Sequence, residues 1–212
     1  MKSEYDEFAK DFSQTRKNPW PEFETFLPFI NRDDRILDLG CGNGRFRQVL
    51  EKGLIPEGNY FGMDISGGLL EIARKNYPKD HFFRGAFEQR FPFGNNNFEV
   101  VSGIASFHHC LSVQEQMNFL NESWRVLKPG GKLCLTTWIL PKKFFWSNFW
   151  KGRVFTKNWI IPFGKEKLPR TYRNVSDNDL KNLFKKSGFE ILKLEKFKGR
   201  NLVVVAEKQP IK

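Results

Sequence analysis

Short apolar runs alternate with amphipathic stretches along most of the chain, and this alternation predicts the order of strands and helices. Strands are predicted near residues 35–39, 59–64, 80–84, 98–104, 132–139, 189–196 and 201–207. Apolar positions with a helical period predict helices near residues 45–53, 67–76, 112–127 and 176–187, and two more near 4–13 and 19–30. Strands that alternate with helices are typical of an α/β domain with a mostly parallel sheet.

The segment 141–173 interrupts this alternation. It contains nine basic residues, one acidic residue and nine aromatic residues, with prolines at positions 141, 162 and 169. We interpret it as a basic aromatic insertion in a single domain spanning residues 1–212, in which residues 1–33 form an N-terminal helical segment outside the repeat of the sheet. The run Lys128-Pro129-Gly130-Gly131 predicts a turn that ends one helix and starts the next strand.

The excess of positive charge lies in the last third of the chain, although the formal net charge of +11 belongs to the whole. Residues 1–140 carry 17 Lys and Arg against 18 Asp and Glu, whereas residues 141–212 carry 18 against 6. Because a local excess of this size attracts anions, we expect an anionic partner at the C-terminal third. The alternative is a solvated basic face that keeps the protein in solution.

The composition argues against the membrane and disulfide-rich classes. No apolar run approaches the roughly 20 residues of a membrane span, and the first residues, MKSEYDE, are polar and unlike a signal peptide. Cys41, Cys110 and Cys134 do not form the close pairs that a zinc site needs. We expect a soluble cytoplasmic protein with reduced thiols, no metal site and no membrane contact.

The firmest motif is ILDLGCGNG at residues 36–44, a buried strand that leads into a glycine loop. Glycines let the backbone turn sharply and approach a ligand where a Cβ atom would collide. A dinucleotide-binding loop requires Gly-x-Gly-x-x-Gly, whereas this loop reads Gly-x-Gly-x-Gly and has Arg at position 45. The next strand ends at Asp64, where a carboxylate can accept both hydroxyls of a ribose. The loop and the acid together favour a nucleoside cofactor other than NAD.

With these motifs in this order, residues 34–140 resemble the class I S-adenosylmethionine-dependent methyltransferases. The resemblance implies an α/β fold with a doubly wound, mostly parallel seven-stranded sheet and helices on both faces. It implies S-adenosylmethionine as the cofactor, bound by Asp38, Gly40, Gly42, Gly44, Asp64 and Ile104. Asp38 would orient the amino end of the cofactor and Asp64 its ribose. Alternatively, Asp38 caps loop amides and Asp64 is a solvated turn residue.

The loop after the third strand departs from the pattern of this family. Many relatives place an Asp there, which accepts from the adenine amino group, whereas this chain has Ala86-Phe87-Glu88. We expect Glu88 to take that part in cofactor binding. The alternative is that Glu88 is an ordinary surface residue, since glutamates are mostly exposed.

Three further segments resemble one subfamily, the tRNA wobble-uridine methyltransferases that convert 5-carboxymethyluridine to its methyl ester. They are FSQTRKNPWP at 12–21, IASFHH at 104–109, and RTYR at 170–173 together with GRNLVVVAEK at 199–208. The resemblance implies the tRNA anticodon loop as a partner. It also raises a small zinc-binding activator subunit that would cover the third strand, His81-Phe82-Phe83.

This chemistry suits the residues available, because a carboxymethyl group is ionised near neutral pH and needs no strong general base. Catalysis would then depend on alignment. We expect Arg16 to clamp the acceptor carboxylate, or alternatively to fix the N-terminal segment through a salt bridge. We expect His108 or His109, at the carboxyl end of the fourth strand, to contact the substrate, or else to be structural histidines.

Cations and aromatic side chains near the same edge of the sheet predict an RNA surface, since cations bind phosphates and rings stack on unpaired bases. The candidates for substrate or RNA binding at this edge are Trp138, Lys142, Lys143 and Arg153, and the segments that resemble the subfamily add Trp20, Arg173, Arg200 and Asn201. Four other aromatic residues and a lysine could surround the same RNA loop: Phe145, Trp146, Trp150, Trp159 and Lys151. Alternatively, these aromatics cover the sheet edge as a lid.

Two other functions are compatible with the sequence. One is a small-molecule or lipid methyltransferase, for example on a quinone precursor, whose insertion lies on an anionic membrane. The other is a non-catalytic RNA-binding module that keeps the glycine loop without using it. The complete set of motif residues argues against the module: Asp38, Gly40, Gly42, Gly44 and Asp64.

Overall fold

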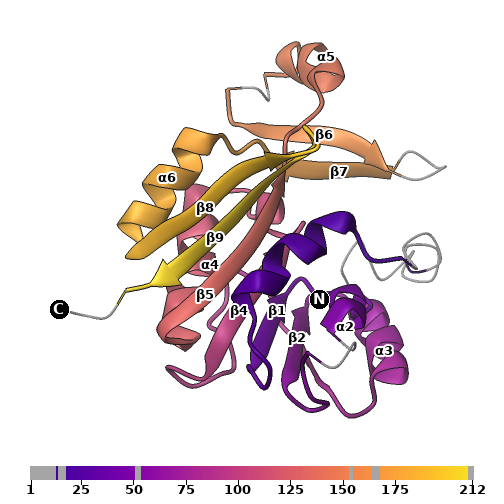
Figure 1. The fold of residues 1–212 in the computed structure, drawn as a ribbon. Helices are drawn as coiled ribbons and strands as arrows, with labels where there is room; N and C mark the ends of the chain where they lie inside the picture. The colour runs from indigo at the N-terminus through magenta and orange to yellow at the C-terminus, as the bar shows by residue number, and fades with distance from the viewer. Residues whose placement is uncertain (1–12, 14–17, 51–53, 153–154, 164–167, 210–212) are drawn as a thin grey trace.

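The computed structural model describes residues 13, 18–50, 54–152, 155–163 and 168–209. Seven strands form the main sheet in the order β3-β2-β1-β4-β5-β9-β8 (Figure 1). Its strands are β1 (Ile36–Leu39), β2 (Tyr60–Asp64), β3 (His81–Arg84), β4 (Phe98–Ile104), β5 (Leu127–Trp138), β8 (Phe189–Phe197) and β9 (Asn201–Lys208). The helices beside it are α2 (Arg45–Leu50), α3 (Gly67–Asn76), α4 (Val113–Val126) and α6 (Asp177–Lys186), with the 3-10 helices η2 (Pro21–Phe29) and η3 (Phe107–His109).

The pairing confirms the predicted α/β architecture with a mostly parallel sheet. Strands β1 to β5 pair in parallel, whereas β9 pairs antiparallel with both β5 and β8. The order of the strands along the chain reverses direction at β1, with β2 on one side and β4 on the other. Open α/β sheets bind ligands at such a switch point, beyond the carboxyl ends of the strands.

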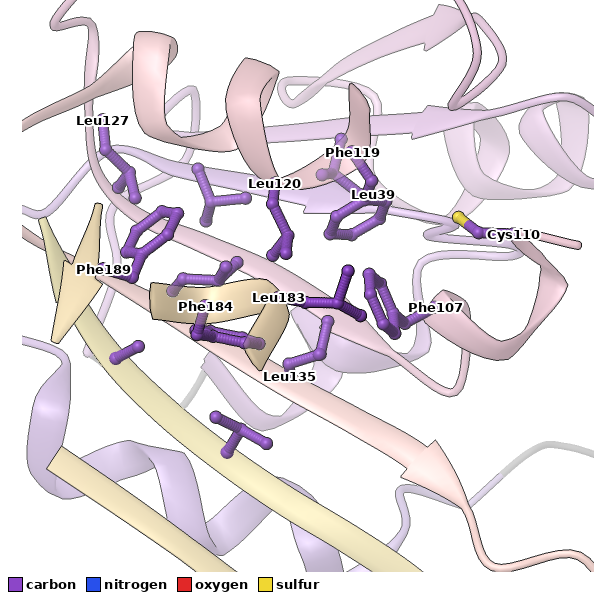
Figure 2. Close-up of a cluster of buried hydrophobic side chains, with 14 of the residues drawn as sticks. Leu39, Phe107, Cys110, Phe119, Leu120, Leu127, Leu135, Leu183, Phe184 and Phe189 are labelled. Carbon is purple, nitrogen blue, oxygen red and sulfur yellow. The ribbon is translucent and has the colours of Figure 1, made fainter. Parts of the chain in front are cut away.

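Two apolar clusters lie on opposite faces of this sheet, because neighbouring residues of a strand point to opposite faces. Ile36 packs in the cluster that contains η2, α2 and α3, whereas Leu37 packs in the cluster that contains α4 and α6. The second cluster includes Phe119 and Leu120 of α4 (Figure 2). Both faces are therefore covered, which explains why the central strands are apolar at nearly every position.

Two predicted elements differ in detail. The helix predicted at 19–30 is the nine-residue 3-10 helix η2, which has Pro21 at its start and Pro28 inside it. The turn predicted at 128–131 lies within β5, because Leu127 already pairs with Phe98 of β4 before the register shifts. These four residues therefore form a bulge in a strand that starts earlier than predicted. The helix predicted at 4–13 lies outside the described residues except for residue 13.

The segment after β5 folds into a small unit beside the main sheet. It contains η4 (Lys142–Phe144), α5 (Phe145–Phe149) and an antiparallel pair, β6 (Asn158–Phe163) and β7 (Leu168–Arg173). The sequence did not predict β6 and β7, because each contains a proline. Pro162 and Pro169 face each other across the pair, and a two-stranded sheet tolerates them because both strands have an open edge. In Figure 1, α5 lies beyond β6 and β7 at the outer end of this unit.

Among the described residues, none of the helices combines the length and the apolar character needed to cross a membrane.

Candidate active site

A cavity of about 230 Å³ opens at the carboxyl ends of β1, β2 and β4, where the strand order reverses. This volume is far above that of one ordered water, so the cavity can hold a small molecule. Its lining comes from the glycine loop, from the loops after β2, β3 and β4, and from the N-terminal segment before β1. The lining residues are Trp20, Phe23, Asp38, Gly40, Cys41, Gly42, Asn43, Arg45, Phe46, Asp64, Ile65, Leu69, Gly85, Ala86, Phe87, Glu88, Ile104, Ala105, Ser106 and His109.

The glycine loop requires its glycines for two different reasons. Gly40 has φ +76°, and a Cβ atom there would lie 2.6 Å from Cβ of Ser106 in the turn after β4. Gly42 has φ +56°, but the nearest atom to a Cβ would be 3.9 Å away, on the cavity side. Gly40 thus lets two loops meet, and Gly42 lets a ligand approach the backbone. Gly44 packs against Tyr77 and does not line the cavity.

Asp38 lies at the bottom of the cavity in a hydrogen-bond network across three adjacent strands. Its carboxylate accepts hydrogen bonds from the Tyr60 hydroxyl at 2.5 Å and the Ser102 hydroxyl at 2.7 Å. Burial raises the pKa of this carboxyl to about 6, although both hydrogen bonds favour the charged form. Asp38 is therefore an oriented acid that titrates close to neutral pH, rather than a simple cap for loop amides.

Asp64 connects the end of β2 to the glycine loop. One of its oxygens accepts a hydrogen bond from the Gly42 backbone N–H at 2.9 Å, and the other accepts one from the Ser66 N–H at 2.8 Å. A carboxylate has about four acceptor positions, so these bonds leave capacity for the hydroxyls of a ligand. Asp64 therefore shapes the loop as well as lining the cavity.

The turn after β4 is held in an unusual backbone conformation. Ala105 has φ +53°, a region that is costly for residues other than glycine, and the Thr136 hydroxyl accepts a hydrogen bond from its N–H at 2.8 Å. This turn directs Ser106 to the cavity. The Ser106 Oγ atom is buried and has no hydrogen-bond partner among the described residues. Strain beside an unpartnered hydroxyl is typical of a ligand site, and the sequence analysis missed this residue.

The two predicted histidines have different positions. His109 lines the cavity, whereas His108 is 1% exposed and lies behind it, with Nδ1 accepting from the Trp138 N–H at 3.3 Å. Burial, with a contribution from the Arg170 charge, lowers the pKa of His109 to about 4. Burial also holds the pKa of His108 well below its usual value. Both imidazoles are therefore neutral at physiological pH.

Aromatic stacking joins these histidines to the β6–β7 unit. The Tyr172 ring lies 5.0 Å from the rings of both His109 and Trp138, centroid to centroid. Arg170, two residues earlier in β7, is 4% exposed. The segment 141–173 thus supplies a buried cation and an aromatic ring beside the cavity. The sequence predicted only Arg173 of the run RTYR as a binding residue, and did not single out Arg170 or Tyr172.

A cationic side chain from the start of α2 forms part of the cavity wall. The Arg45 guanidinium lies 3.9 Å from the ring centroid of Trp20, which also lines the cavity. Stacking of this kind orients both side chains. Trp20 therefore packs on the residue that follows the glycine loop. Arg45, which stands where a dinucleotide-binding loop would have a glycine, is part of the cavity wall.

Glu88, which was predicted to bind the adenine of the cofactor, is exposed. It lines the cavity together with Ala86 and Phe87. The Asn118 side chain of α4 donates a hydrogen bond to the Phe87 carbonyl at 2.6 Å and so fixes this loop. Ile104, at the end of β4, also lines the cavity.

The remaining predicted residues lie away from the cavity or outside the described chain. Arg173 donates to the carbonyls of Leu111 and Thr156, and Asn201 donates to Glu22 of η2 at 2.6 Å, so both fasten elements together. Four others do not line the cavity: Trp138, Lys142, Lys143 and Arg200. Arg16 and Arg153 lie outside the described residues.

The chain matches known proteins in sequence and in fold. The methyltransferase domain family matches residues 37–135. A protein of Encephalitozoon cuniculi named as a methyltransferase is 31% identical over 193 residues, which cover 89% of this chain and 86% of that protein. The tRNA (carboxymethyluridine(34)-5-O)-methyltransferase of Saccharomyces cerevisiae is 31% identical over 170 residues. This match covers 79% of this chain but only 58% of the yeast protein.

Solved structures share the fold at low sequence identity. A methyltransferase from Methanosarcina mazei superposes with a TM-score of 0.75 at 18% identity, covering 91% of this chain and 99% of that one. A methyltransferase from Haloferax volcanii, solved in complex with the Trm112 activator, gives 0.74 at 17% identity, covering 99% and 100%.

The glycine loop, the acid after β2 and the strand order thus define one class of protein. The chain belongs to the class I S-adenosylmethionine-dependent methyltransferase family. The cavity fits S-adenosylmethionine, because its lining combines acidic acceptors, a hydroxyl without a hydrogen-bond partner among the described residues, and apolar side chains. The acceptors are Asp38, Asp64 and Ser106, and the apolar residues are Ile65, Leu69, Ala86, Phe87 and Ile104.

Proposed function

We propose that this protein transfers the methyl group of S-adenosylmethionine to the carboxylate of 5-carboxymethyluridine at the wobble position of tRNA. When bound, the cofactor supplies an electrophilic methyl group, which the acceptor carboxylate attacks in line. In this proposal the chain binds the cofactor through the glycine loop and orients its amino end at Asp38 and its ribose at Asp64. Glu88 and Ile104 would contact the adenosine half.

The observation that carries the proposal is the position of His109, which lines the cavity and packs on Tyr172 of β7, the strand that also holds the buried Arg170. A base with a pKa of about 4 is too weak to remove a proton from a hydroxyl or an amine at neutral pH. A carboxylate needs no such base, because it is already ionised. The neutral imidazole of His109 can donate a hydrogen bond to one oxygen, and the buried charge of Arg170 beside it attracts an anion. Arg16 remains a proposed second cation for the same carboxylate.

The identity of the acceptor is supported by the relatives. The yeast protein and an Arabidopsis thaliana protein, 29% identical over 175 residues, are both named as tRNA carboxymethyluridine methyltransferases. This chain covers 58% and 41% of their lengths. Tyr172 of the basic segment 141–173 packs on His109 of the cavity wall, and a segment rich in cations suits a polyanionic acceptor. Because tRNA is the proposed acceptor, we expect the protein in the cytoplasm.

We also propose an activator subunit at β3. Among the described residues this strand is the last in the sheet and pairs with β2 alone, which leaves one edge of its backbone for another chain. The Haloferax volcanii methyltransferase with the same fold was solved with an activator. Measuring methyl transfer with and without a Trm112-type subunit tests this proposal, and a chain that is equally active and stable alone would contradict it.

The main experiment uses the full chain, labelled S-adenosylmethionine and tRNA that contains 5-carboxymethyluridine. We expect an alkali-labile methyl ester, and no ester on the same tRNA without the carboxymethyl group. Nucleoside mass spectrometry identifies the product. Absence of transfer in the presence of a Trm112-type subunit would overturn the proposal, and label in a lipid extract instead of tRNA would favour a lipid methyltransferase.

A further inference from the structure

Three large aromatic side chains at the outer end of the small unit are exposed to solvent over most of their surface. The exposed fractions are 63% for Trp146, 80% for Trp150 and 79% for Phe155. Only two other large apolar side chains of the described residues are exposed, Val113 and Leu192. Exposed rings gathered in one place cost solvation free energy, so they indicate a contact surface. We call these three residues the aromatic tip.

A buried side chain fastens the helix that carries two rings of the aromatic tip. Asn148 of α5 is 2% exposed, and its side chain forms hydrogen bonds with the strand β6. Its Oδ1 accepts from the Ile160 N–H at 2.8 Å, and its Nδ2 donates to the carbonyls of Phe144 at 2.8 Å and Ile160 at 3.3 Å. One buried amide therefore fastens the five-residue helix α5 to the pair β6–β7. The rings are held outward instead of collapsing onto the sheet.

The rings meet edge to face, which leaves flat faces uncovered. Phe149 contacts Trp146 at 5.7 Å with an interplanar angle of 80°, and Trp150 at 5.7 Å with an angle of 78°. In this arrangement each exposed indole can receive a planar group on its open face. Unpaired nucleobases are planar groups of this kind, and they stack on aromatic side chains in single-stranded RNA complexes.

The charged side chains of the segment that carries the aromatic tip are positive. The described residues 141–152 and 155–163 contain four lysines and no acidic residue: Lys142, Lys143, Lys151 and Lys157. Lys142, Lys143 and Lys151 are exposed, whereas Lys157 forms an ion pair with Asp179 at 2.7 Å. Exposed cations beside exposed ring faces match a strand of phosphates and bases.

We propose that the aromatic tip binds unpaired bases of the RNA strand next to the nucleotide in the cavity. This inference rests on the proposed function, because it assumes a tRNA acceptor. The other end of the same unit, Tyr172, packs on His109 of the cavity, so the pair β6–β7 connects the tip to the proposed acceptor end. A membrane fits less well, because an interfacial helix presents an apolar face over several turns and α5 has five residues.

The test compares the double variant Trp146→Ala/Trp150→Ala with Leu192→Ala, which removes an exposed apolar side chain of β8 that is 45% exposed. Binding to a labelled anticodon stem-loop RNA and to a duplex RNA of equal length is measured. We expect the tip variant to bind the stem-loop roughly tenfold or more weakly, with a much smaller change for the duplex. Leu192→Ala should bind like the unmodified chain. Equal stem-loop affinity of all three proteins would overturn the proposal.

Two further measurements separate this inference from the proposed function. The affinity for S-adenosylmethionine should be the same in all three proteins, since the tip lies outside the cavity. If the unmodified chain methylates tRNA but the tip variant has an unchanged KM for tRNA, only the further inference fails. If the unmodified chain binds vesicles of phosphatidylserine and phosphatidylcholine and the tip variant does not, with RNA binding intact, the tip is a membrane contact and the inference is wrong.

Discussion

The two halves of the cavity are built in different ways. The half formed by the glycine loop, Asp38 and Asp64 consists of tight backbone turns at the ends of adjacent strands, and hydrogen bonds to the two carboxylates hold it together. The half around His109 consists of stacked side chains, and its partners Trp138 and Tyr172 come from β5 and β7. Backbone turns therefore shape the proposed donor side, whereas packing of side chains from β5 and β7 shapes the proposed acceptor side.

This difference predicts that substitutions on the two sides separate donor binding from acceptor use. On the donor side, a change of backbone conformation should affect both the fold and the affinity for S-adenosylmethionine. On the acceptor side, a change of side chain should affect transfer while donor affinity remains. Measuring stability, donor affinity and transfer for variants of each side tests this separation.

Gly40→Ala should have the largest effect. A Cβ atom at φ +76° is strained, and it would lie 2.6 Å from Cβ of Ser106, so two loops of the site must move apart. We expect the free energy of unfolding to fall by about 2–4 kcal/mol and the Kd for S-adenosylmethionine to rise roughly a hundredfold. Denaturant unfolding and titration calorimetry measure the two effects. Gly94→Ala is the matched control, because no atom lies within 4 Å of its Cβ position; equal behaviour of both variants would contradict the role given to Gly40.

The charge of Asp38 should make donor binding depend on pH. Its folded-state pKa of about 6 is above the unfolded value of 3.8, so the folded protein holds this proton more tightly. The stability of the unliganded protein should therefore fall by about 3 kcal/mol as pH rises from 3.8 to 6, and then level off. The carboxylate would pair with the ammonium group of S-adenosylmethionine. The affinity of the protein for S-adenosylmethionine should therefore rise roughly tenfold from pH 5 to pH 7, while the stability of the unliganded protein does not rise.

Calorimetric titrations with S-adenosylmethionine at several pH values check the Asp38 prediction. Asp38→Asn should bind more weakly and lose the dependence between pH 5 and pH 7. Tyr60→Phe keeps the carboxylate but removes a hydrogen bond that favours its charged form, so the midpoint should move to higher pH. A pH dependence that survives in Asp38→Asn would assign the titration to another group.

Ser106→Ala should weaken function without weakening the fold. The Oγ atom is buried without a hydrogen-bond partner among the described residues, so its removal should leave the free energy of unfolding unchanged or slightly higher. If this hydroxyl bonds to donor or acceptor, affinity or kcat should fall about five- to tenfold. Ser102→Ala is the comparison. Because the Ser102 hydroxyl donates a hydrogen bond to Asp38, this substitution should lower the free energy of unfolding. A Ser106→Ala protein that is less stable and equally active would contradict the prediction.

The contrast between the two halves also explains how much could be predicted from sequence. The alternation of strands and helices along the chain, the glycine loop and Asp64 follow from local patterns, since periodicity and glycine spacing are read within a few residues. The arrangement of the strands in the sheet was expected from the family resemblance instead. Ser106 and Arg170 carry no local signal of this kind. Their meaning depends on the αL turn at Ala105 and on the return of β7 to η3, which are tertiary features. The strands β6 and β7 could not be predicted for the same reason. A proline argues against a strand, and only the pairing of Pro162 with Pro169 in a two-stranded sheet shows why both are tolerated.

His109→Gln should have the smallest effect, and it tests the absence of a general base. Glutamine keeps a neutral hydrogen-bond donor but cannot accept a proton as a base, so a positioning role predicts a loss of kcat below about tenfold, whereas loss of a general base usually costs 10²- to 10⁴-fold. Because the pKa of His109 is about 4, kcat should also be flat between pH 6 and pH 8 in both proteins. The Kd for S-adenosylmethionine should not change, since the donor side is intact. A thousandfold loss, or a kcat that rises through pH 6–8 only in the unmodified chain, would mean that His109 removes a proton and that the acceptor is not a carboxylate.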